Sequence, residues 1–300
     1  MALGGAASSR PRGYFGNSAY SGCVKPPNFD PPPDIRLIAA DMDGTLLDEN
    51  KELHHNFWPT VEALFERGIS FAAASGRQYH TLYRLFGEVA DELIYIAENG
   101  AYLVHGSTEI AAQALDNDLV RRVVLAVRTL TAEGADLGVV VCGKDSAYIE
   151  RNHPAFRAET DEYYVSLALL PDLLDRPVDD ILKVAVYDFG SAEQHTWPAL
   201  SSFAAEAQVV LSGQHWVDVQ SLGTNKGAAL RRVQRVLGIT SAQTMVFGDF
   251  LNDLELMDSA DYSFAMDNAH PLLRERARFV APPNTENGVV RTITAALRLP

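Results

Sequence analysis

Short apolar segments alternate with amphipathic segments in the first hundred residues of this chain, and the alternation restricts its fold class. Residues 35–40, 69–74 and 93–97 have the length and composition of buried strands. Between the first two, apolar residues recur at helical spacing over 57–65, and Gly68 marks the end of that helix. Alternating strands and helices predict a parallel sheet with helices on both faces.

The same alternation returns near the C-terminus, after a middle third of different character. The late elements are a helix at 226–237, a strand at 244–247 and a helix from residue 253; the middle contains strands at 137–141, 147–150, 181–187 and 207–211 and helices at 117–132 and 192–206. We therefore expect a Rossmann-like α/β core formed by residues 34–104 and 218–300, with an α+β cap domain inserted at residues 105–217.

The first 33 residues differ from the rest in composition. They are rich in Gly, Ala, Ser, Asn and Pro, and they end in the run Pro31-Pro32-Pro33. Without apolar periodicity, residues 1–33 are interpreted as a flexible extension with a stiff proline spacer. A transit peptide is the alternative, although the segment carries only three basic residues.

The overall charge and composition exclude several classes of protein. The formal net charge is −14, and no basic patch is evident, so a nucleic-acid partner is not expected. No apolar stretch approaches the roughly 20 residues that span a bilayer, so no membrane partner is expected. With only Cys23 and Cys142, the composition suits a reducing compartment. We expect a cytoplasmic protein that is a monomer or a weak homo-oligomer.

Carboxylates follow two of the predicted core strands without an intervening loop. The first strand runs into Asp41 and Asp43, and the late strand runs into Asp249, with Asp253 four residues further on. The alternatives are a turn at Asp43 and a helix cap at Asp253. Acids at the ends of apolar strands must be paired or coordinated to be tolerated. Because the carboxyl ends of parallel strands share one edge, these acids suit a Mg²⁺ site.

Two further segments suggest phosphate binding. Ser75, Gly76 and Arg77 follow the second strand and offer a hydroxyl, a backbone amide and a guanidinium at a helix start. A serine that merely caps the helix is the alternative, and the more common case. Lys226 opens the late helix, where the helix dipole disfavours a cation. A solvated lysine is the default interpretation there.

Four ordered motifs combine these groups, at residues 41–46, 75–77, 226–227 and 248–253, and three further polar segments lie at residues 98–101, 265–269 and 284–289. The four motifs resemble those of haloacid dehalogenase-type phosphatases, and the three further segments resemble the Cof-type branch of that superfamily. The resemblance covers residues 34–300. The sequence departs from the family pattern at Phe250, which replaces a smaller or polar residue, and at Asp267, which replaces a frequent glycine.

The resemblance implies specific roles for these residues. Asp41 is expected to be the nucleophile that forms an aspartyl-phosphate, and Asp43 the general acid and base, with a pKa nearer neutrality than that of a free aspartate. Mg²⁺ is expected on Asp41, the Asp43 carbonyl and Asp249, supported by Asp253. The implied substrate- and phosphate-binding residues are Met42, Ser75, Gly76, Arg77, Lys226 and Asn252.

The expected function is a Mg²⁺-dependent phosphatase for small phosphorylated metabolites, either sugar phosphates or nucleotide or vitamin phosphates. A phosphotransferase or phosphomutase on the same machinery, or a non-catalytic binding protein, is the alternative. The phosphate site is expected to be generic and the cap to select the alcohol, with Gly106 and Gly223 as hinge positions. His215 and Trp216 in the cap are interpreted as structural, and Cys142 as a buried strand residue.

Overall fold

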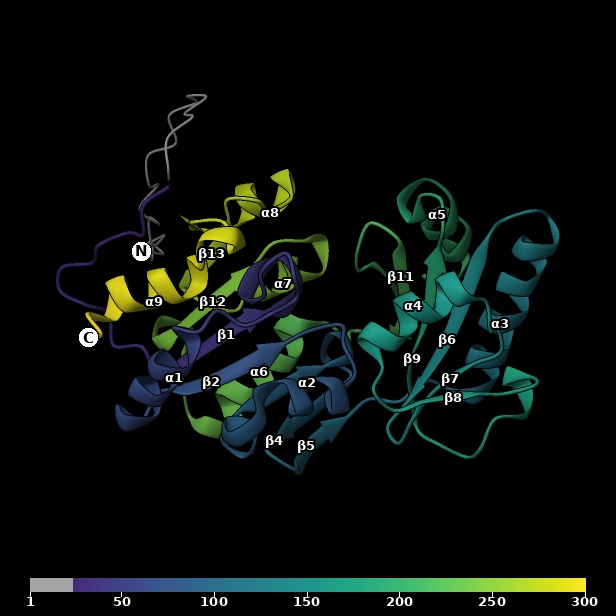
Figure 1. Cartoon of the computed structure of the whole chain (residues 1–300), viewed down its shortest axis with the longest axis horizontal. Helices are drawn as coiled ribbons and strands as arrows, with labels where there is room; N and C mark the ends of the chain where they lie inside the picture. Colours follow the sequence, from purple (N-terminus) through teal and green to yellow (C-terminus); the bar gives the residue numbers. More distant parts are fainter. Residues whose placement is uncertain (1–23) are drawn as a thin grey trace, which may run out of the picture.

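The computed structural model describes residues 24–300 (Figure 1). Residues 1–23 of the predicted extension, Cys23 included, lie outside the described part. Phe29, near the end of that extension, makes edge-on ring contacts with Tyr262 and Phe279 at centroid distances of 5.5 and 5.3 Å. This end of the extension therefore packs on the core. No helix within residues 24–300 is long and apolar enough to cross a membrane.

An eight-stranded sheet forms the core, in the order β14-β13-β12-β1-β2-β3-β4-β5. The strand β1 is central and parallel to both β2 and β12. Its five residues are all buried, because helices cover both faces of the sheet. The predicted α/β class is confirmed. The strands are β1 (Leu37–Asp41), β2 (Ser70–Ala74), β3 (Ile94–Ala97), β4 (Tyr102–His105), β5 (Thr108–Ala112), β12 (Thr244–Gly248), β13 (Tyr262–Met266) and β14 (Phe279–Ala281).

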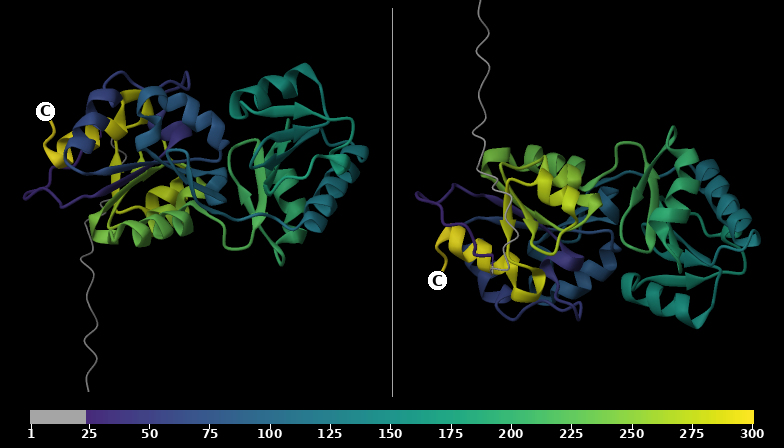
Figure 2. Two further views of the ribbon diagram at one scale, coloured as in Figure 1. Left: turned by 90° about the horizontal axis from the view of Figure 1, so that it is seen from below. Right: turned by 90° about the horizontal axis from the view of Figure 1, so that it is seen from above.

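Helices pack on the two faces of this sheet (Figure 2). α1, α2 and α9 lie on one face, and α6, α7 and α8 lie on the other. Helix α1 buries Phe57, Val61 and Leu64, the positions that the helical spacing predicts. The helices are α1 (Phe57–Glu66), α2 (Tyr79–Phe86), α6 (Lys226–Leu237), α7 (Leu254–Met257), α8 (Pro271–Arg276) and α9 (Gly288–Leu297).

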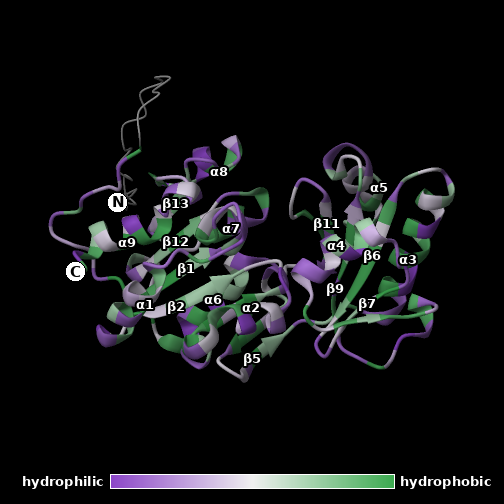
Figure 3. Cartoon of the chain, in the orientation of Figure 1, coloured by the Kyte–Doolittle hydropathy of each residue, from purple (hydrophilic) through white to green (hydrophobic). Residues whose placement is uncertain are grey.

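A second sheet of six strands, in the order β10-β11-β9-β6-β7-β8, forms the inserted part. Its pairs are antiparallel except for β7 with β8. The strands of both sheets carry mostly hydrophobic residues (Figure 3). The elements are α3 (Asn117–Ala132), β6 (Leu137–Gly143), β7 (Ala147–Ile149), α4 (Pro154–Tyr163), β8 (Leu167–Leu169), β9 (Ile181–Asp188), α5 (Trp197–Leu200), β10 (Ala207–Leu211) and β11 (Trp216–Ser221).

One predicted helix of the insert is not continuous. Residues 192–203 form a short π-helical turn, α5 and a 3₁₀ turn, and residues 204–206 are outside any helix. Pro198 lies in the first turn of α5, and its ring nitrogen has no hydrogen to donate to the preceding turn. The prediction for α3, by contrast, agrees with its observed bounds.

The connections between the two sheets differ from the expected ones. The expected boundaries fall inside the β4–β5 hairpin and inside β11, so the connecting segments are residues 113–116 and 222–225. Gly106 is the turn of the hairpin, at φ +55°, where an added Cβ would lie 2.5 Å from the Asp91 carbonyl oxygen. Its prediction as a hinge is therefore wrong, whereas Gly223 does lie in the second connection. We propose residues 113–221 as the cap domain.

Candidate active site

Asp41, the last residue of β1, lies against a buried lysine. Lys226, the first residue of α6, is fully buried, and its Nζ donates to Asp41 Oδ1 and, at 2.7 Å, to Asp253 Oδ1. The two carboxylates offset the unfavourable position of a cation at a helix N-terminus. The solvated-lysine alternative is therefore wrong, and β1, α6 and the loop after β12 meet at this point.

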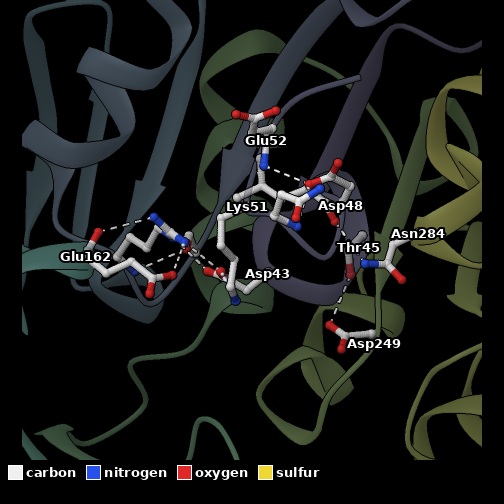
Figure 4. A network of polar contacts seen from close by, with 12 residues as sticks. Asp43, Thr45, Asp48, Lys51, Glu52, Glu162, Asp249 and Asn284 are labelled. Atoms are coloured by element: carbon white, nitrogen blue, oxygen red, sulfur yellow. Dashed lines mark hydrogen bonds and ion pairs between the residues drawn. The ribbon is translucent and has the colours of Figure 1, made fainter. Parts of the chain in front are cut away.

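A glycine turn brings the loop after β1 close to the loop after β12. Gly44 has φ +78°, and a Cβ at this position would collide with the Asp249 carboxylate. Only glycine fits both the backbone angle and this approach. Next to it, the Thr45 hydroxyl donates to Asp249 Oδ1 at 3.1 Å (Figure 4). The turn therefore fixes Asp249 beside the end of β1.

Three carboxylates form a cluster at this edge of the sheet. Asp41, Asp249 and Asp253 each offer an oxygen, and the three oxygens lie within 4.8 Å of one another. Burial raises the pKa of Asp41 well above its usual value, against the opposing charge of Lys226. Burial and the Asp253 charge raise the pKa of Asp249 to about 7. Three carboxylates surround a single ammonium group, that of Lys226, so negative charge remains unbalanced. This set of oxygen donors fits a divalent metal such as Mg²⁺.

Asp43 points away from this cluster. Its carboxylate accepts from Arg77 Nε and Nη2, both at 2.7 Å, and from Lys51 Nζ at 2.9 Å (Figure 4). Burial raises the pKa of Asp43, but the hydrogen bonds and charge of Arg77, aided by Lys51, outweigh it and hold the pKa below its usual value. The expectation of a pKa nearer neutrality is wrong for this arrangement.

The loop after β2 is ordered by its own polar groups and by the cap. Ser75 is buried, and its hydroxyl accepts from the Arg77 amide at 3.1 Å. Ser75 is not the N-cap of α2, because Gln78 has that position. The Gly76 carbonyl accepts from Lys183 Nζ of the cap at 2.6 Å. The Arg77 guanidinium lies 4.9 Å from the ring centroid of Tyr163, also in the cap.

A cavity of about 480 Å³ lies between the core and the cap. Met42, Lys226 and Asp253 are not among the residues that line it. The Met42 side chain is fully buried in the core, so only its backbone amide could contact a phosphate. Phosphate binding by Met42 stays a prediction. The predicted site residues that line the cavity are Asp41, Asp43, Ser75, Gly76, Arg77, Asp249 and Asn252.

The cap contributes a wall that the sequence analysis missed. His215 and Trp216, interpreted as structural, both line the cavity. Trp216 contacts Tyr187 edge-on at 4.9 Å and Tyr163 at 5.7 Å between ring centroids. No spacing motif joins these positions, because the pairing of β9 with β11 places Tyr187 opposite Trp216 and the packing of α4 adds Tyr163. Further missed residues of the lining are Lys51, Glu159, Tyr164, Lys183 and Asp218.

Comparisons with known proteins agree with this architecture. A family model described as haloacid dehalogenase-like hydrolase matches residues 38–293. The chain is 31% identical over 267 residues to the 5-amino-6-(5-phospho-D-ribitylamino)uracil phosphatase YbjI of Escherichia coli (strain K12), covering 88% of this chain and 97% of the relative. It is 30% identical over 240 residues to the HMP-PP phosphatase of Cronobacter sakazakii, covering 79% of this chain and 86% of the relative.

A solved structure extends the agreement to the fold. The structure of SMU.1108c from Streptococcus mutans UA159 superimposes with a TM-score of 0.82 at 24% identity. The match covers 88% of this chain and 100% of that chain. At this identity the likeness concerns the fold, and it includes the cap as well as the core.

Proposed function

The chain belongs to the haloacid dehalogenase-like hydrolases and is a phosphoric monoester hydrolase, and from this premise we propose how its residues divide the reaction. The family inferred from the motifs is thereby confirmed. The carrying observation is the cavity in which Asp41, Asp43, Ser75, Gly76 and Asp249 all line the core side. A phosphate ester bound there meets a nucleophile, a proton-transfer group and hydrogen-bond donors together.

Asp41 is the nucleophile in this proposal. One of its carboxylate oxygens attacks phosphorus, the ester bond to the alcohol oxygen breaks, and an aspartyl-phosphate forms. Attack requires the ionised carboxylate, which burial disfavours. The Lys226 ammonium, in contact with Asp41, stabilises that ionised form and orients it. We therefore propose that the main role of Lys226 is to stabilise and orient Asp41. From that position its ammonium would also contribute positive charge to the bound phosphate oxygens.

Asp43 transfers the protons. It protonates the leaving alkoxide and then accepts a proton from the water that hydrolyses the aspartyl-phosphate. The lowered pKa of Asp43, caused by Arg77 and Lys51, favours the ionised form needed in the second step. A bound phosphate adds negative charge nearby and raises the pKa of Asp43, which favours the protonated form for the first step.

Mg²⁺ would be held by the carboxylates of Asp41, Asp249 and Asp253 and by the Asp43 carbonyl. When bound, the ion neutralises charge on the phosphoryl oxygens. The Ser75 hydroxyl, the amides of Gly76 and Met42, Arg77 and the Asn252 amide would hold the phosphate. Their contribution is electrostatic stabilisation of the transferring group. The fit of the site to a cation rests on the excess of carboxylates over lysine.

The substrate class is a small phosphorylated metabolite. The relatives named above act on 5-amino-6-(5-phospho-D-ribitylamino)uracil and on HMP-PP, so phosphates of the vitamin and nucleotide type are the first candidates for this chain. The aromatic wall of Tyr163, Tyr187 and Trp216 supports that choice, because aromatic faces stack on flat rings. Its place in the cap suits a role in selecting the alcohol.

The test is release of inorganic phosphate from a panel of sugar, nucleotide and vitamin phosphates, measured for the wild type and Asp41→Asn. We expect Asp41→Asn to lower kcat by a factor of about 10³ or more, because a carboxamide does not attack phosphorus. The control, Asp267→Asn, changes an aspartate paired with Arg274 outside the cavity and should retain activity. Turnover by Asp41→Asn within tenfold of wild type, or transfer to a second alcohol without phosphate release, would contradict the proposal.

A further inference from the structure

A buried lysine of the cap contacts the core directly beside the phosphate loop. Lys183 lies on β9 and is almost fully buried. Its Nζ donates to the Gly76 carbonyl at 2.6 Å and lies 3.0 Å from Glu98 Oε2 and 3.3 Å from Asp218 Oδ2. Glu98 belongs to the core and Asp218 to the cap strand β11. The lysine therefore joins both parts of the protein at the base of the cavity.

A second set of contacts leads from the same cap strand to another phosphate-binding candidate. Asp218 Oδ2 accepts from Asn99 Nδ2. On its other side, Asn99 Oδ1 accepts from Asn252 Nδ2 at 3.0 Å. Lys183 and Asp218 lie diagonally on neighbouring antiparallel strands, so their side chains share the face that meets the core. The cap thus contacts Gly76 directly through Lys183, and it is connected to Asn252 through Asp218 and Asn99.

The core turn between these contacts has an unfavourable backbone. Glu98 and Asn99 have φ values of +50° and +53°, in the left-handed region that side chains other than glycine rarely adopt. Their amides donate to the carbonyls of Arg77 and Ser75 at 3.1 and 2.9 Å. Such strain persists only where the surroundings hold it. Here the turn is hydrogen-bonded to the phosphate loop, and the cap contacts both of its side chains.

The charges in this contact depend on the cap being docked. Glu98 is fully buried, and burial raises its pKa, against the opposing charge of Lys183. If the cap moved away, Glu98 would lose its cationic partner and the Gly76 carbonyl would lose its donor. Both contacts exist only while the cap is docked. Docking of the cap and order in the 75–77 loop are therefore energetically linked.

We propose that Lys183 is a positioning residue through which the docked cap orders the phosphate-binding groups of the core. Lys183 fixes Gly76, and Asp218 fixes Asn252 through Asn99. The phosphate site is then completed by the cap instead of being generic to the core. This inference rests on the proposed function for the identity of the ligand, and it assigns the cap a role in phosphate binding in addition to selection of the alcohol.

The experiment compares Lys183→Met with Lys144→Met. Lys144 of the cap pairs with Glu109 of β5 at 2.7 Å, so its substitution breaks a cap–core ion pair away from the phosphate loop. The measurements are kcat and KM for several phosphate esters and Ki for inorganic phosphate. We expect Lys183→Met to raise Ki about tenfold and to lower kcat/KM by a similar factor for every ester. Lys144→Met should change both by less than twofold.

A second variant addresses folding. Lys183→Met leaves Glu98 buried without a cation, so Lys183→Met with Glu98→Gln removes the unmatched charge and should recover the melting temperature while Ki stays raised. Lys183→Arg keeps a donor for the Gly76 carbonyl and should restore part of the phosphate affinity. A Ki within twofold of wild type in the folded double variant, or a loss confined to one ester, would overturn the inference.

The same data separate this inference from the proposed function. Binding of inorganic phosphate is measured by calorimetry independently of turnover. If the wild type hydrolysed no ester but bound phosphate, and Lys183→Met weakened that binding, the proposed function would fail and the positioning role would stand. If the wild type hydrolysed esters and Lys183→Met matched Lys144→Met in every measurement, the positioning role would fail alone.

Discussion

Two aspartates within one site differ in acidity because their immediate surroundings differ. Asp41 and Asp43 are separated by one residue, yet the pKa of Asp41 is raised and that of Asp43 is lowered. Both are subject to burial, but Asp43 accepts two hydrogen bonds from Arg77, whereas Asp41 shares Lys226 with Asp253. Acidity at this site therefore follows from the partner of each carboxylate.

Arg77→Met is expected to raise the pKa of Asp43, because burial then acts against Lys51 alone. The measurement is the carboxyl ¹³C chemical shift of Asp43 across pH, assigned with Asp43→Asn. Arg77→Lys retains a positive charge without the bidentate geometry and should give a smaller rise. An unchanged titration in Arg77→Met would show that Arg77 does not set the acidity of Asp43.

At the scale of elements, α6 determines where Lys226 lies. Asn225 caps the helix by accepting from the Ala228 amide at 2.7 Å, and Gly238 ends it in the left-handed conformation at φ +67°. Both ends are therefore fixed by local sequence. Because Lys226 follows the cap directly, the start of the helix sets the position of its ammonium against Asp41.

Asn225→Ala is expected to lower the free energy of unfolding by about 1 kcal/mol, since one amide of the first turn loses its acceptor. Urea unfolding followed by circular dichroism gives this value. Asn225→Ser keeps a capping oxygen and should lose much less. Equal stability of Asn225→Ala and wild type would mean that solvent replaces the cap without cost.

At the scale of the whole molecule, the carboxylate cluster adds to the negative charge of a protein whose net charge is −14. An anionic substrate is repelled at long range, and the local cations Lys51, Arg77 and Lys183 line the cavity. A bound divalent cation would reverse the local field further. Because the same carboxylates would bind the metal and titrate, the stability of the protein and its affinity for metal should both change with pH.

Without metal, stability should fall as pH rises from about 4 to about 7. Asp249 is ionised above its usual pKa of 3.8 when unfolded, but its pKa in the folded protein is about 7, so the folded state binds the extra proton over that interval. Mg²⁺ should raise the melting temperature more at pH 8 than at pH 5, because it binds the ionised carboxylates.

Thermal unfolding with Mg²⁺ or with EDTA at the two pH values checks this expectation, and Asp249→Asn, which removes the titrating group, should lose most of the pH-dependent gain. EDTA should also abolish turnover, and Mg²⁺ should restore it. Ca²⁺, whose larger coordination shell misplaces the nucleophile, should inhibit. A metal-induced gain that is the same at both pH values would contradict the assignment of Asp249.

Local patterns in the sequence determined the core and the positions of the acids. The apolar run before Asp41 and the helical spacing of Phe57, Val61 and Leu64 are visible in short windows, because strand and helix periodicities repeat within a few residues. The same reasoning located α3 and α6. The strands β4, β5, β8, β11, β13 and β14 and the helices α4, α8 and α9 were not predicted.

The tertiary structure alone decided which of these side chains meet. Asp43 and Arg77 are 34 residues apart, and Lys183 and Gly76 are 107 apart, so no local window relates them. Their contacts depend on strand order and on the docking of the cap. The acidity of Asp43 and the Lys183 contact with the phosphate loop arise from long-range pairing, because a carboxylate or carbonyl responds to the groups that folding places around it.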